Sequence, residues 1–312
     1  MTAMLVIGGI ALLWIGGELL IRGSVRLAAT LGVRPLIIGL TVVAFGTSSP
    51  ELAASLVAAL ANTHDMVLGN VVGSNILNIA LILGLTGLLY PLATNGSLLR
   101  REIPVMLGAG LLLFGILANG AIGRWEGGVL FGLLCIYLVV LYRDRREGDR
   151  PEELAVPVPL RSGRPGLAVL QVIMGIVTLT LGARWLVNGA REVALAWGIT
   201  DRIIGLTIVA FGTSLPELVS ALIAALRQEA DLVLGNLVGS SIFNVLAILG
   251  LTALVRPIAV DPGPVILDLA LMTGIGAVAW LLLATRRRME RWEGGVLLAL
   301  FALYVMYLFV VK

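Results

Sequence analysis

Long apolar runs separated by short polar stretches make up almost the whole chain. A helix that crosses a bilayer needs about 20 mainly apolar residues, and this length criterion gives ten candidate spans in the chain. Their approximate boundaries are 3–29, 35–60, 67–89, 102–118, 124–142, 166–196, 202–226, 231–255, 264–284 and 291–311. The only sizeable polar linker between them is 143–165. The pattern therefore predicts an all-α membrane protein with ten transmembrane helices, five on each side of this linker.

The two sets of five spans carry the same motifs in the same order. LIIGLTVVAFGTSSPEL (36–52) aligns with RIIGLTIVAFGTSLPEL (202–218), and DMVLGNVVGSNILNIALILGLT (65–86) aligns with DLVLGNLVGSSIFNVLAILGLT (231–252). Both alignments keep one offset of 166 residues. Self-similarity of this kind indicates an internal duplication.

Because each copy has an odd number of spans, the second copy enters the membrane from the opposite side. The sequence thus predicts inverted-topology repeats related by a pseudo-two-fold axis in the membrane plane. The first five-helix repeat covers 1–142, with its core at 35–86, and the second covers 166–312, with its core at 201–252.

Arginines gather in the odd-numbered connections between spans, including the linker 143–165. Since positively charged loops stay in the cytoplasm, we expect the linker to be cytoplasmic and both termini to lie outside. The N-terminus has no basic leader before its apolar stretch. We therefore expect a retained first span and not a cleaved signal peptide.

Composition agrees with a membrane protein and excludes several other classes. Hydrophobic residues make up 59% and charged residues 13%, against about 25% charged residues in soluble domains. The net charge of +3 is spread over short loops and gives no nucleic-acid signal. The single cysteine, Cys135, permits no internal disulfide. The expected partners are the lipid bilayer and small ions, and the oligomeric state is left open.

Two copies of a polar motif, FGTSSPEL and FGTSLPEL, interrupt apolar spans. Placing a charge at the centre of a membrane helix costs about 2.5–3.5 kcal/mol. The cost of inserting Glu51 and Glu217 must therefore be offset by a function or by polar partners. The proline in each motif breaks the helical hydrogen-bond ladder. Thr47 and Thr213 each lie four residues before a glutamate and share its helix face. Carboxylate, hydroxyl and freed carbonyl oxygens are ligands that hard cations such as Ca²⁺ and Na⁺ prefer.

The third and eighth spans each carry a stripe of polar residues at intervals of four: Asn70, Ser74 and Asn78, and Asn236, Ser240 and Asn244. Such residues often only tie membrane helices together, with about 0.6–2 kcal/mol per hydrogen bond. For the outer members of each stripe, this structural role and a role at the ion site are equally good interpretations.

The paired motifs GTS-x-PE and GN-x-x-GS-x-x-x-N resemble the sodium/calcium exchanger branch of the cation/Ca²⁺ exchanger superfamily. The resemblance covers all ten spans, and the chain looks like a compact prokaryotic member in the plasma (inner) membrane. It implies a secondary antiporter that exchanges Ca²⁺ for Na⁺ by alternating access at a mid-membrane site. In the family picture the first and sixth spans slide against the other eight.

The resemblance also implies the roles of individual residues. Glu51 and Glu217 would be the main Ca²⁺ carboxylates, shared with Na⁺, and the backbone carbonyls of Thr47 and Thr213 would be further Ca²⁺ ligands. Asn78 and Asn244 would line the centre. The implied Na⁺ ligands, the alanines through their carbonyls, are Ala44, Ser48, Ser74, Ala210, Ser214 and Ser240.

The counter-ion is left open by one departure from the family pattern. Sodium/calcium exchangers often carry Asp in one half where this chain has Asn78 or Asn244, and proton-coupled relatives can use Asn there. Two ionised glutamates neutralise one Ca²⁺ or two Na⁺, and protons could neutralise the same carboxylates. The hydroxyls of the motifs favour Na⁺, because proton exchange needs no cage of oxygen ligands.

Two other classes of function are weaker interpretations of the same motifs. An intramembrane hydrolase would need a nucleophile motif such as G-x-S-x-G, which G-T-S-x-P does not match. The lone histidine, His64, falls in a short outer connection. A passive cation channel would conduct Ca²⁺ without a counter-ion gradient. The chain also lacks a P-loop pattern, so we expect no enzyme, no cofactor and no ATP.

Overall fold

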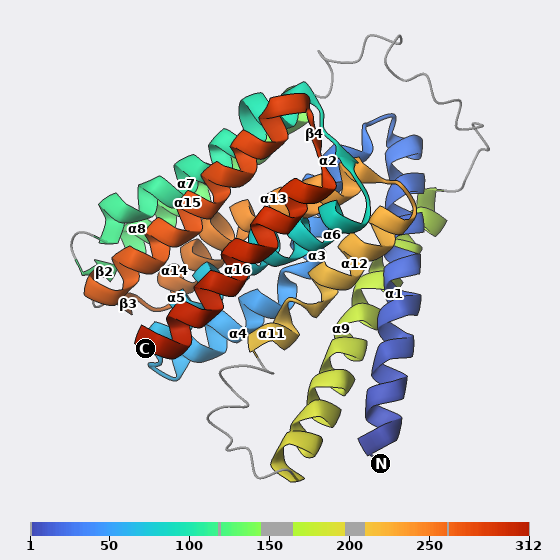
Figure 1. Ribbon diagram of the computed structural model, residues 1–312. Coiled ribbons are helices and arrows are strands. Elements are labelled where there is room, and N and C mark those ends of the chain that lie inside the picture. The colour runs from blue at the N-terminus through green and yellow to red at the C-terminus, as the bar shows by residue number, and fades with distance from the viewer. Residues whose placement is uncertain (1, 118–119, 145–164, 197–209, 261, 312) are drawn as a thin grey trace.

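The computed structural model describes residues 2–117, 120–144, 165–196, 210–260 and 262–311 (Figure 1). The described chain is almost entirely helical, as its apolar runs predict. Most of the linker 143–165 and the first residues of the predicted span 202–226 lie outside these ranges.

The helices of the first half follow one another with few interruptions, and the π-helical segments are labelled η. They are α1 (Thr2–Leu31), α2 (Pro35–Ile38), η1 (Gly39–Val43), α3 (Ala44–Thr47), α4 (Ser49–Leu60), α5 (His64–Ile76), η2 (Leu77–Ile82), α6 (Leu83–Leu89), η3 (Leu98–Glu102), α7 (Ile103–Leu117) and α8 (Arg124–Asp144). The second half has α9 (Pro165–Ala196), α11 (Ala210–Thr213), α12 (Leu215–Leu226), α13 (Ala230–Phe243), η5 (Asn244–Leu249), α14 (Gly250–Val255), α15 (Pro262–Arg286) and α16 (Arg291–Val311).

The described residues contain seven helices that are long and apolar enough to cross a membrane. The pair Pro35–Thr47 and Ser49–Leu60 passes the same test as one broken span, which gives up to eight. These coincide with predicted spans to within a few residues. Two predicted spans are too short to pass: Ile103–Leu117 has 15 residues, and 202–226 is described only from its ninth residue. The helical membrane class is confirmed, and the count of ten stays a prediction.

The helices α1 and α9 lie side by side and run in opposite directions (Figure 1). Glycines face the partner helix at regular intervals, so that the two backbones come into contact. A methyl group added at Gly16 would lie 2.6 Å from the amide nitrogen of Leu179, and one added at Gly175 would lie 2.5 Å from that of Leu20. The same close approach to the partner backbone recurs at Gly9, Gly23 and Gly182, while Gly189 packs against the side chain of Val6. Small residues at such an interface let membrane helices pack closely.

Two short strand pairings, which the apolar pattern did not predict, link the ends of helices from different halves. Strand β1 (Leu92–Ala93) pairs with β4 (Arg288–Met289), and β2 (Ala121–Ile122) pairs with β3 (Ile258–Ala259). Both pairings are antiparallel. They satisfy backbone groups in connections that have no helical partner.

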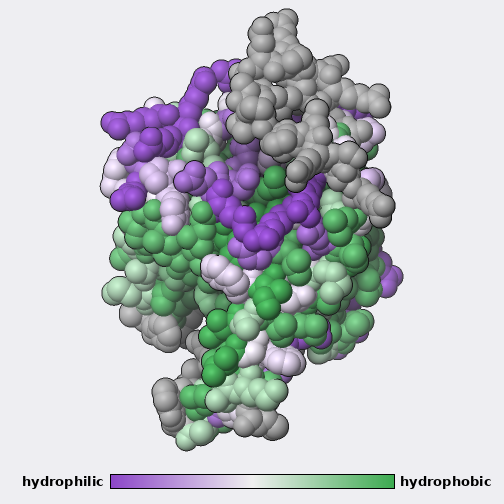
Figure 2. Space-filling model, turned by 90° about the vertical axis from the view of Figure 1, so that its right-hand side faces the viewer, coloured by the Kyte–Doolittle hydropathy of each residue, from purple (hydrophilic) through white to green (hydrophobic). Residues whose placement is uncertain are grey.

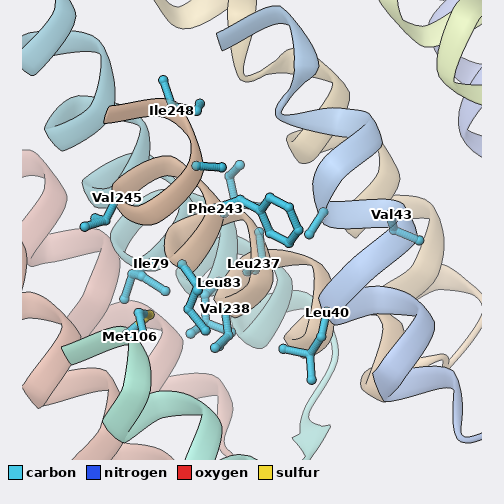
Figure 3. Packing of buried hydrophobic residues seen from close by; sticks show 14 of the residues in the cluster. Leu40, Val43, Ile79, Leu83, Met106, Leu237, Val238, Phe243, Val245 and Ile248 are labelled. Atoms are coloured by element: carbon cyan, nitrogen blue, oxygen red, sulfur yellow. The ribbon is translucent and has the colours of Figure 1, made fainter. Parts of the chain in front are cut away.

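The centre of the molecule is formed by the third and eighth spans. In the most apolar stretch of His64–Leu89, 72% of the residues are buried, and in that of Ala230–Val255 the share is 83%. The corresponding share for Thr2–Leu31 is 33%. The helix α13 packs against η1 and α3 of the other half, where a methyl group at Gly239 would lie 2.8 Å from the Cα of Leu40. Figure 3 shows how apolar side chains of both halves, such as Leu237 and Ile79, surround this region.

The outer surface carries a broad hydrophobic region below a hydrophilic end (Figure 2). Large apolar side chains are exposed along the outer helices, for example Trp14 at 54% and Ile136 at 61%. A soluble protein rarely exposes such a continuous apolar surface. The surface is that of an integral membrane protein.

Candidate functional site

A break in the helix precedes each of two buried glutamates. The chain bends by 43° where α3 meets α4. Ser48 at this bend has a ψ of 2°, far from the helical value of about −42°. Pro50 has no N–H to donate to the carbonyl of Gly46 one turn earlier, so the regular ladder stops there. Ser214 makes the same break between α11 and α12, with a ψ of 6° and Pro216 two residues later.

Glu51 and Glu217 each occupy the first turn of the helix that follows the break. Both side chains are only 1% exposed. The unpaired N–H groups of a first helical turn carry partial positive charge, which favours a carboxylate there. Burial nevertheless costs a carboxylate its hydration, so each needs polar partners inside the protein.

Each glutamate receives a hydrogen bond from the serine of the other half. The hydroxyl of Ser48 donates to Oε1 of Glu217 at 3.2 Å, and that of Ser214 donates to Oε1 of Glu51 at 3.0 Å. The hydroxyl of Ser74 lies 3.3 Å from that of Ser214. The two halves therefore bring both carboxylates into one buried centre.

Asn78 and Asn244 lie in the π-helical segments η2 and η5. Both are 1% exposed. The segment η2 packs against α12, which carries Glu217, and η5 packs against α4, which carries Glu51. A π-helical turn widens a helix locally and often marks a functional site. Each asparagine thus belongs to one half and lies near the glutamate helix of the other.

Four buried oxygen atoms of these two glutamates and two asparagines have no hydrogen-bond donor among the described residues. They are Oε2 of Glu51, Oε2 of Glu217, Oδ1 of Asn78 and Oδ1 of Asn244. Buried polar atoms in proteins are nearly always paired, and an ionised carboxylate can only accept. A set of unpaired oxygens with two negative charges matches what a hard cation requires of its ligands.

The outer polar residues of the stripes hold the broken helices in place. Asn70 donates to the backbone carbonyl of Glu51 at 3.1 Å and to the hydroxyl of Ser55 at 2.9 Å. In the second half, Asn236 donates to Ser220 at 3.1 Å, and Ser220 donates to the carbonyl of Glu217 at 3.0 Å. These contacts support the structural interpretation of both outer asparagines.

Contacts of the remaining predicted ligands are described for Thr47, Ser240, Thr213 and Ala44. The hydroxyl of Thr47 donates to Oδ1 of Asn236 at 3.2 Å, and that of Ser240 lies 3.4 Å from the same oxygen. Thr213 interacts with Glu51. The carbonyl of Ala44 accepts the N–H of Ser48. Ala210 begins α11, and its side chain lies outside what the structure describes.

Sequence reasoning missed three supporting groups: Ser55, Ser220 and Asn75. Ser55 follows its glutamate by four residues and Ser220 by three, so the repeat alignment does not match them. Asn75 lies one residue outside the polar stripe and accepts a hydrogen bond from Asn244 at 3.0 Å. The sequence indicated Asn75 only through one difference between the repeats, which read GSNI in the first half and GSSI in the second.

Comparison with known proteins gives matches over nearly the whole chain. A family model described as sodium/calcium exchanger protein matches residues 1–143 and 167–310. The inner membrane protein YrbG of Escherichia coli (strain K12) is 36% identical over 305 residues, which cover 95% of this chain and 93% of that protein. The sodium/calcium exchanger MaX1 of Methanosarcina acetivorans is 30% identical and covers 96% of each chain.

Solved structures with a similar fold include the sodium-calcium exchanger NCX_Mj, soaked with zero Na⁺ and Ca²⁺. That structure superimposes with a TM-score of 0.86 at 31% sequence identity, over 98% of both chains. The same exchanger soaked with 10 mM Na⁺ and zero Ca²⁺ gives a TM-score of 0.85 at 30% identity, over 100% of this chain and 99% of that chain.

Proposed function

This chain belongs to the sodium/calcium exchanger protein family, and from that premise we propose that it is a secondary antiporter exchanging Ca²⁺ for Na⁺. The observation that carries the proposal is the buried pair Glu51 and Glu217, each held by a serine of the opposite half. One oxygen of each carboxylate is left unpaired. Two such carboxylates together balance the charge of one divalent cation.

The proposed ligands combine these carboxylates with neutral oxygens, because Ca²⁺ takes six to eight oxygen ligands. Glu51 and Glu217 bind Ca²⁺ and are shared with Na⁺, and the carbonyls of Thr47 and Thr213 complete the Ca²⁺ site. Asn78 and Asn244 line the centre with their amide oxygens. The proposed Na⁺ ligands are Ala44, Ser48, Ser74, Ala210, Ser214 and Ser240.

Exchange follows from competition for the two carboxylates. Either Ca²⁺ or Na⁺ occupies the glutamates at one time, and an empty centre with two unbalanced charges is costly to expose to the low dielectric of the membrane. The site therefore changes its side only when it is occupied. This coupling needs no catalysis and no ATP.

The proposed architecture is ten transmembrane helices in two inverted repeats, 1–142 and 166–312, joined by a cytoplasmic linker at 143–165. The antiparallel course of α1 and α9 supports opposite orientations of the two halves. The strand pairings join the third connection to the ninth and the fourth to the eighth. Connections of equal parity lie on the same side in this topology. Both termini then lie outside, in a prokaryotic plasma (inner) membrane.

Alternating access would come from a movement of α1 and α9 against the remaining helices. The two helices form one tightly packed pair through their glycines. Only 33% of the most apolar window is buried in each, so the pair has a small contact with the rest of the protein. A sliding pair of this kind would expose the centre to each side in turn.

Proton coupling is the second candidate, and one observation favours it. Neutral asparagines stand at both 78 and 244, so the two glutamates are the only acidic residues at the described centre. Two protons would neutralise the centre as completely as one Ca²⁺ does. The serine hydroxyls that contact the carboxylates favour Na⁺ over this alternative.

Reconstitution into liposomes tests the proposal and its alternative together. Purified protein is placed in liposomes loaded with Na⁺, which are diluted into Na⁺-free buffer containing radioactive Ca²⁺. We expect rapid Ca²⁺ uptake that needs the outward Na⁺ gradient. A parallel sample receives a pH gradient alone, with K⁺ replacing Na⁺ on both sides.

The outcomes separate the three classes of transport. Uptake driven only by the pH gradient would replace Na⁺ with H⁺ as the counter-ion. Ca²⁺ entry without any counter-ion gradient would indicate a channel and contradict exchange. Absence of flux under every gradient would contradict transport of Ca²⁺ altogether.

A further inference from the structure

The two halves carry different polar residues at one buried position of the third and eighth spans. Asn75 and Ser241 occupy the same place in the repeat, and both are buried. Ser241 gives its hydroxyl hydrogen to the carbonyl of Leu237 in its own helix, at 2.9 Å. Asn75 instead reaches across to the other half, where its Nδ2 lies 3.4 Å from both the carbonyl of Ser241 and the sulfur of Met272.

The oxygen of Asn75 fixes the orientation of a neighbouring amide. It accepts a hydrogen bond from Nδ2 of Asn244 at 3.0 Å. The amide group is planar and carries its oxygen and nitrogen on opposite sides. When Nδ2 of Asn244 is bound to Asn75, Oδ1 must point away from Asn75. That oxygen is one of the four unpaired oxygens described above.

An asparagine that is not held in this way is a poor cation ligand. If the amide of Asn244 rotates, its NH₂ group replaces its oxygen at the centre. The segment η5 packs against α4, so the NH₂ group could then donate to the unpaired Oε2 of Glu51. Such a bond would occupy a carboxylate oxygen that a cation requires. The orientation of Asn244 thus decides whether it helps or competes with binding.

We propose that Asn75 is a positioning residue that sets the cation affinity of the centre by holding Asn244 with its oxygen inward. The proposal rests on the function inferred above. It also makes the centre asymmetric, since Ser241 donates its hydrogen within its own helix and does not hold Asn78.

A small cavity beside Asn75 leaves room for swapping the side chains of Asn75 and Ser241. Its volume is about 20 Å³, which is enough for one water molecule. It lies between the halves, because its lining includes equivalent residues of both: Asn75 and Ser241, Met106 and Met272, Gly110 and Gly276. An asparagine side chain placed at position 241 would therefore meet the same surroundings that Asn75 meets now.

The test compares Asn75→Ser with the exchanged double variant Asn75→Ser/Ser241→Asn in full-length protein. Na⁺-driven Ca²⁺ uptake into liposomes gives KM and kcat, and thermal unfolding in detergent monitors folding. We expect Asn75→Ser to raise KM for Ca²⁺ about tenfold, as is usual when the partner of a metal ligand is lost, with kcat within about twofold of wild type. The double variant should recover most of the affinity, because the amide introduced by Ser241→Asn would then hold Asn78.

Two results would overturn the proposal. One is an unchanged KM in Asn75→Ser, and the other is a double variant that folds and transports but binds Ca²⁺ as weakly as the single variant. If Asn75→Ser does not fold, the double variant alone decides, since it keeps the total side-chain volume. Glu51→Gln is assayed in parallel as a test of the proposed function. If Glu51→Gln is inactive while Asn75→Ser keeps the wild-type KM, only the role of Asn75 is rejected.

Discussion

The hydroxyl of Ser214 lies 3.0 Å from Oε1 of Glu51, although 163 residues separate the two in the chain. The equivalent contact joins Ser48 to Glu217 at 3.2 Å. Each half therefore supplies the acid of one contact and the hydroxyl of the other. Neither half contains a complete centre, so a test of the function requires substitutions in both contacts, Ser214–Glu51 and Ser48–Glu217.

Removing either carboxylate should stop transport. In Glu51→Gln and in Glu217→Gln, the remaining single charge can no longer balance a divalent cation, and an amide NH₂ group faces it. We expect Ca²⁺ uptake in liposomes to fall to that of protein-free vesicles while the protein stays folded. Glu126→Gln, the same chemical change in the first turn of α8, should transport normally. Exchange at the wild-type rate in either centre variant would remove the support for these ligands.

The two crossed serines should affect affinity more than folding. Ser48→Ala and Ser214→Ala each remove one hydrogen bond to a buried carboxylate, and bonds to charged groups contribute about 1.5–3 kcal/mol. We expect KM for Ca²⁺ or Na⁺ to rise roughly tenfold or more in each variant. Ser49→Ala is the matched control, because the Ser49 hydroxyl donates to the carbonyl of Phe45 instead. Equal increases in KM in Ser48→Ala and Ser49→Ala would contradict the functional role of the hydrogen bond from Ser48 to Glu217.

An ion pair between α1 and the residue that follows α12 should resist the proposed movement of α1. The guanidinium of Arg227 binds Glu18 through Nε at 3.1 Å, while Arg22 binds the same carboxylate from within α1 at 2.9 Å. A partly exposed pair contributes about 0.2–1 kcal/mol. Arg227→Gln should therefore raise the maximal exchange rate by up to about fivefold where the movement of α1 limits the rate.

Arg22→Gln serves as the control for this experiment. Arg22 lies on the same helix as Glu18, so their contact moves with the helix and does not oppose sliding. We expect the maximal exchange rate of Arg22→Gln to equal that of the wild type. A rate increase in Arg22→Gln equal to that in Arg227→Gln would point to surface charge and not to a contact between moving parts.

The glycine contacts of α1 and α9 should tolerate no added carbon atom. In Gly16→Ala the new methyl group would lie 2.6 Å from the backbone of Leu179. Overpacking of this kind typically costs about 1–3 kcal/mol. We expect a lower Tm in detergent, measured by the intrinsic fluorescence of tryptophan. Gly115→Ala, where no described atom lies within 4 Å of the new methyl group, should leave Tm unchanged.

The sequence alone predicted the helices well, because apolar runs of membrane length have few alternatives. The predicted span 231–255 corresponds to α13, η5 and α14, which together cover Ala230–Val255. The break at Ser48 was also predictable, since Pro50 cannot donate to the ladder. The duplication indicated which residues of the two halves would be equivalent, and the structure brings Glu51 and Glu217 together as expected.

Contacts between distant segments were beyond the reach of the sequence. The pairing of Leu92 with Met289 joins two connections whose few residues carry no strand pattern. Ser55 and Ser220 support equivalent helices from positions that are not equivalent in the repeat, so alignment of the halves conceals them. The role of each proposed ligand in ion binding stays a prediction until transport is measured.

The crossed contacts also set the order in which the protein can mature. Glu51 is synthesised and inserted long before the ribosome reaches Ser214, so during that interval the carboxylate has no hydroxyl from the other half. A nascent chain that stops before the second half is complete would leave an uncompensated acid in the bilayer. The finished centre should therefore form only after α12 and η5 of the second half have been inserted.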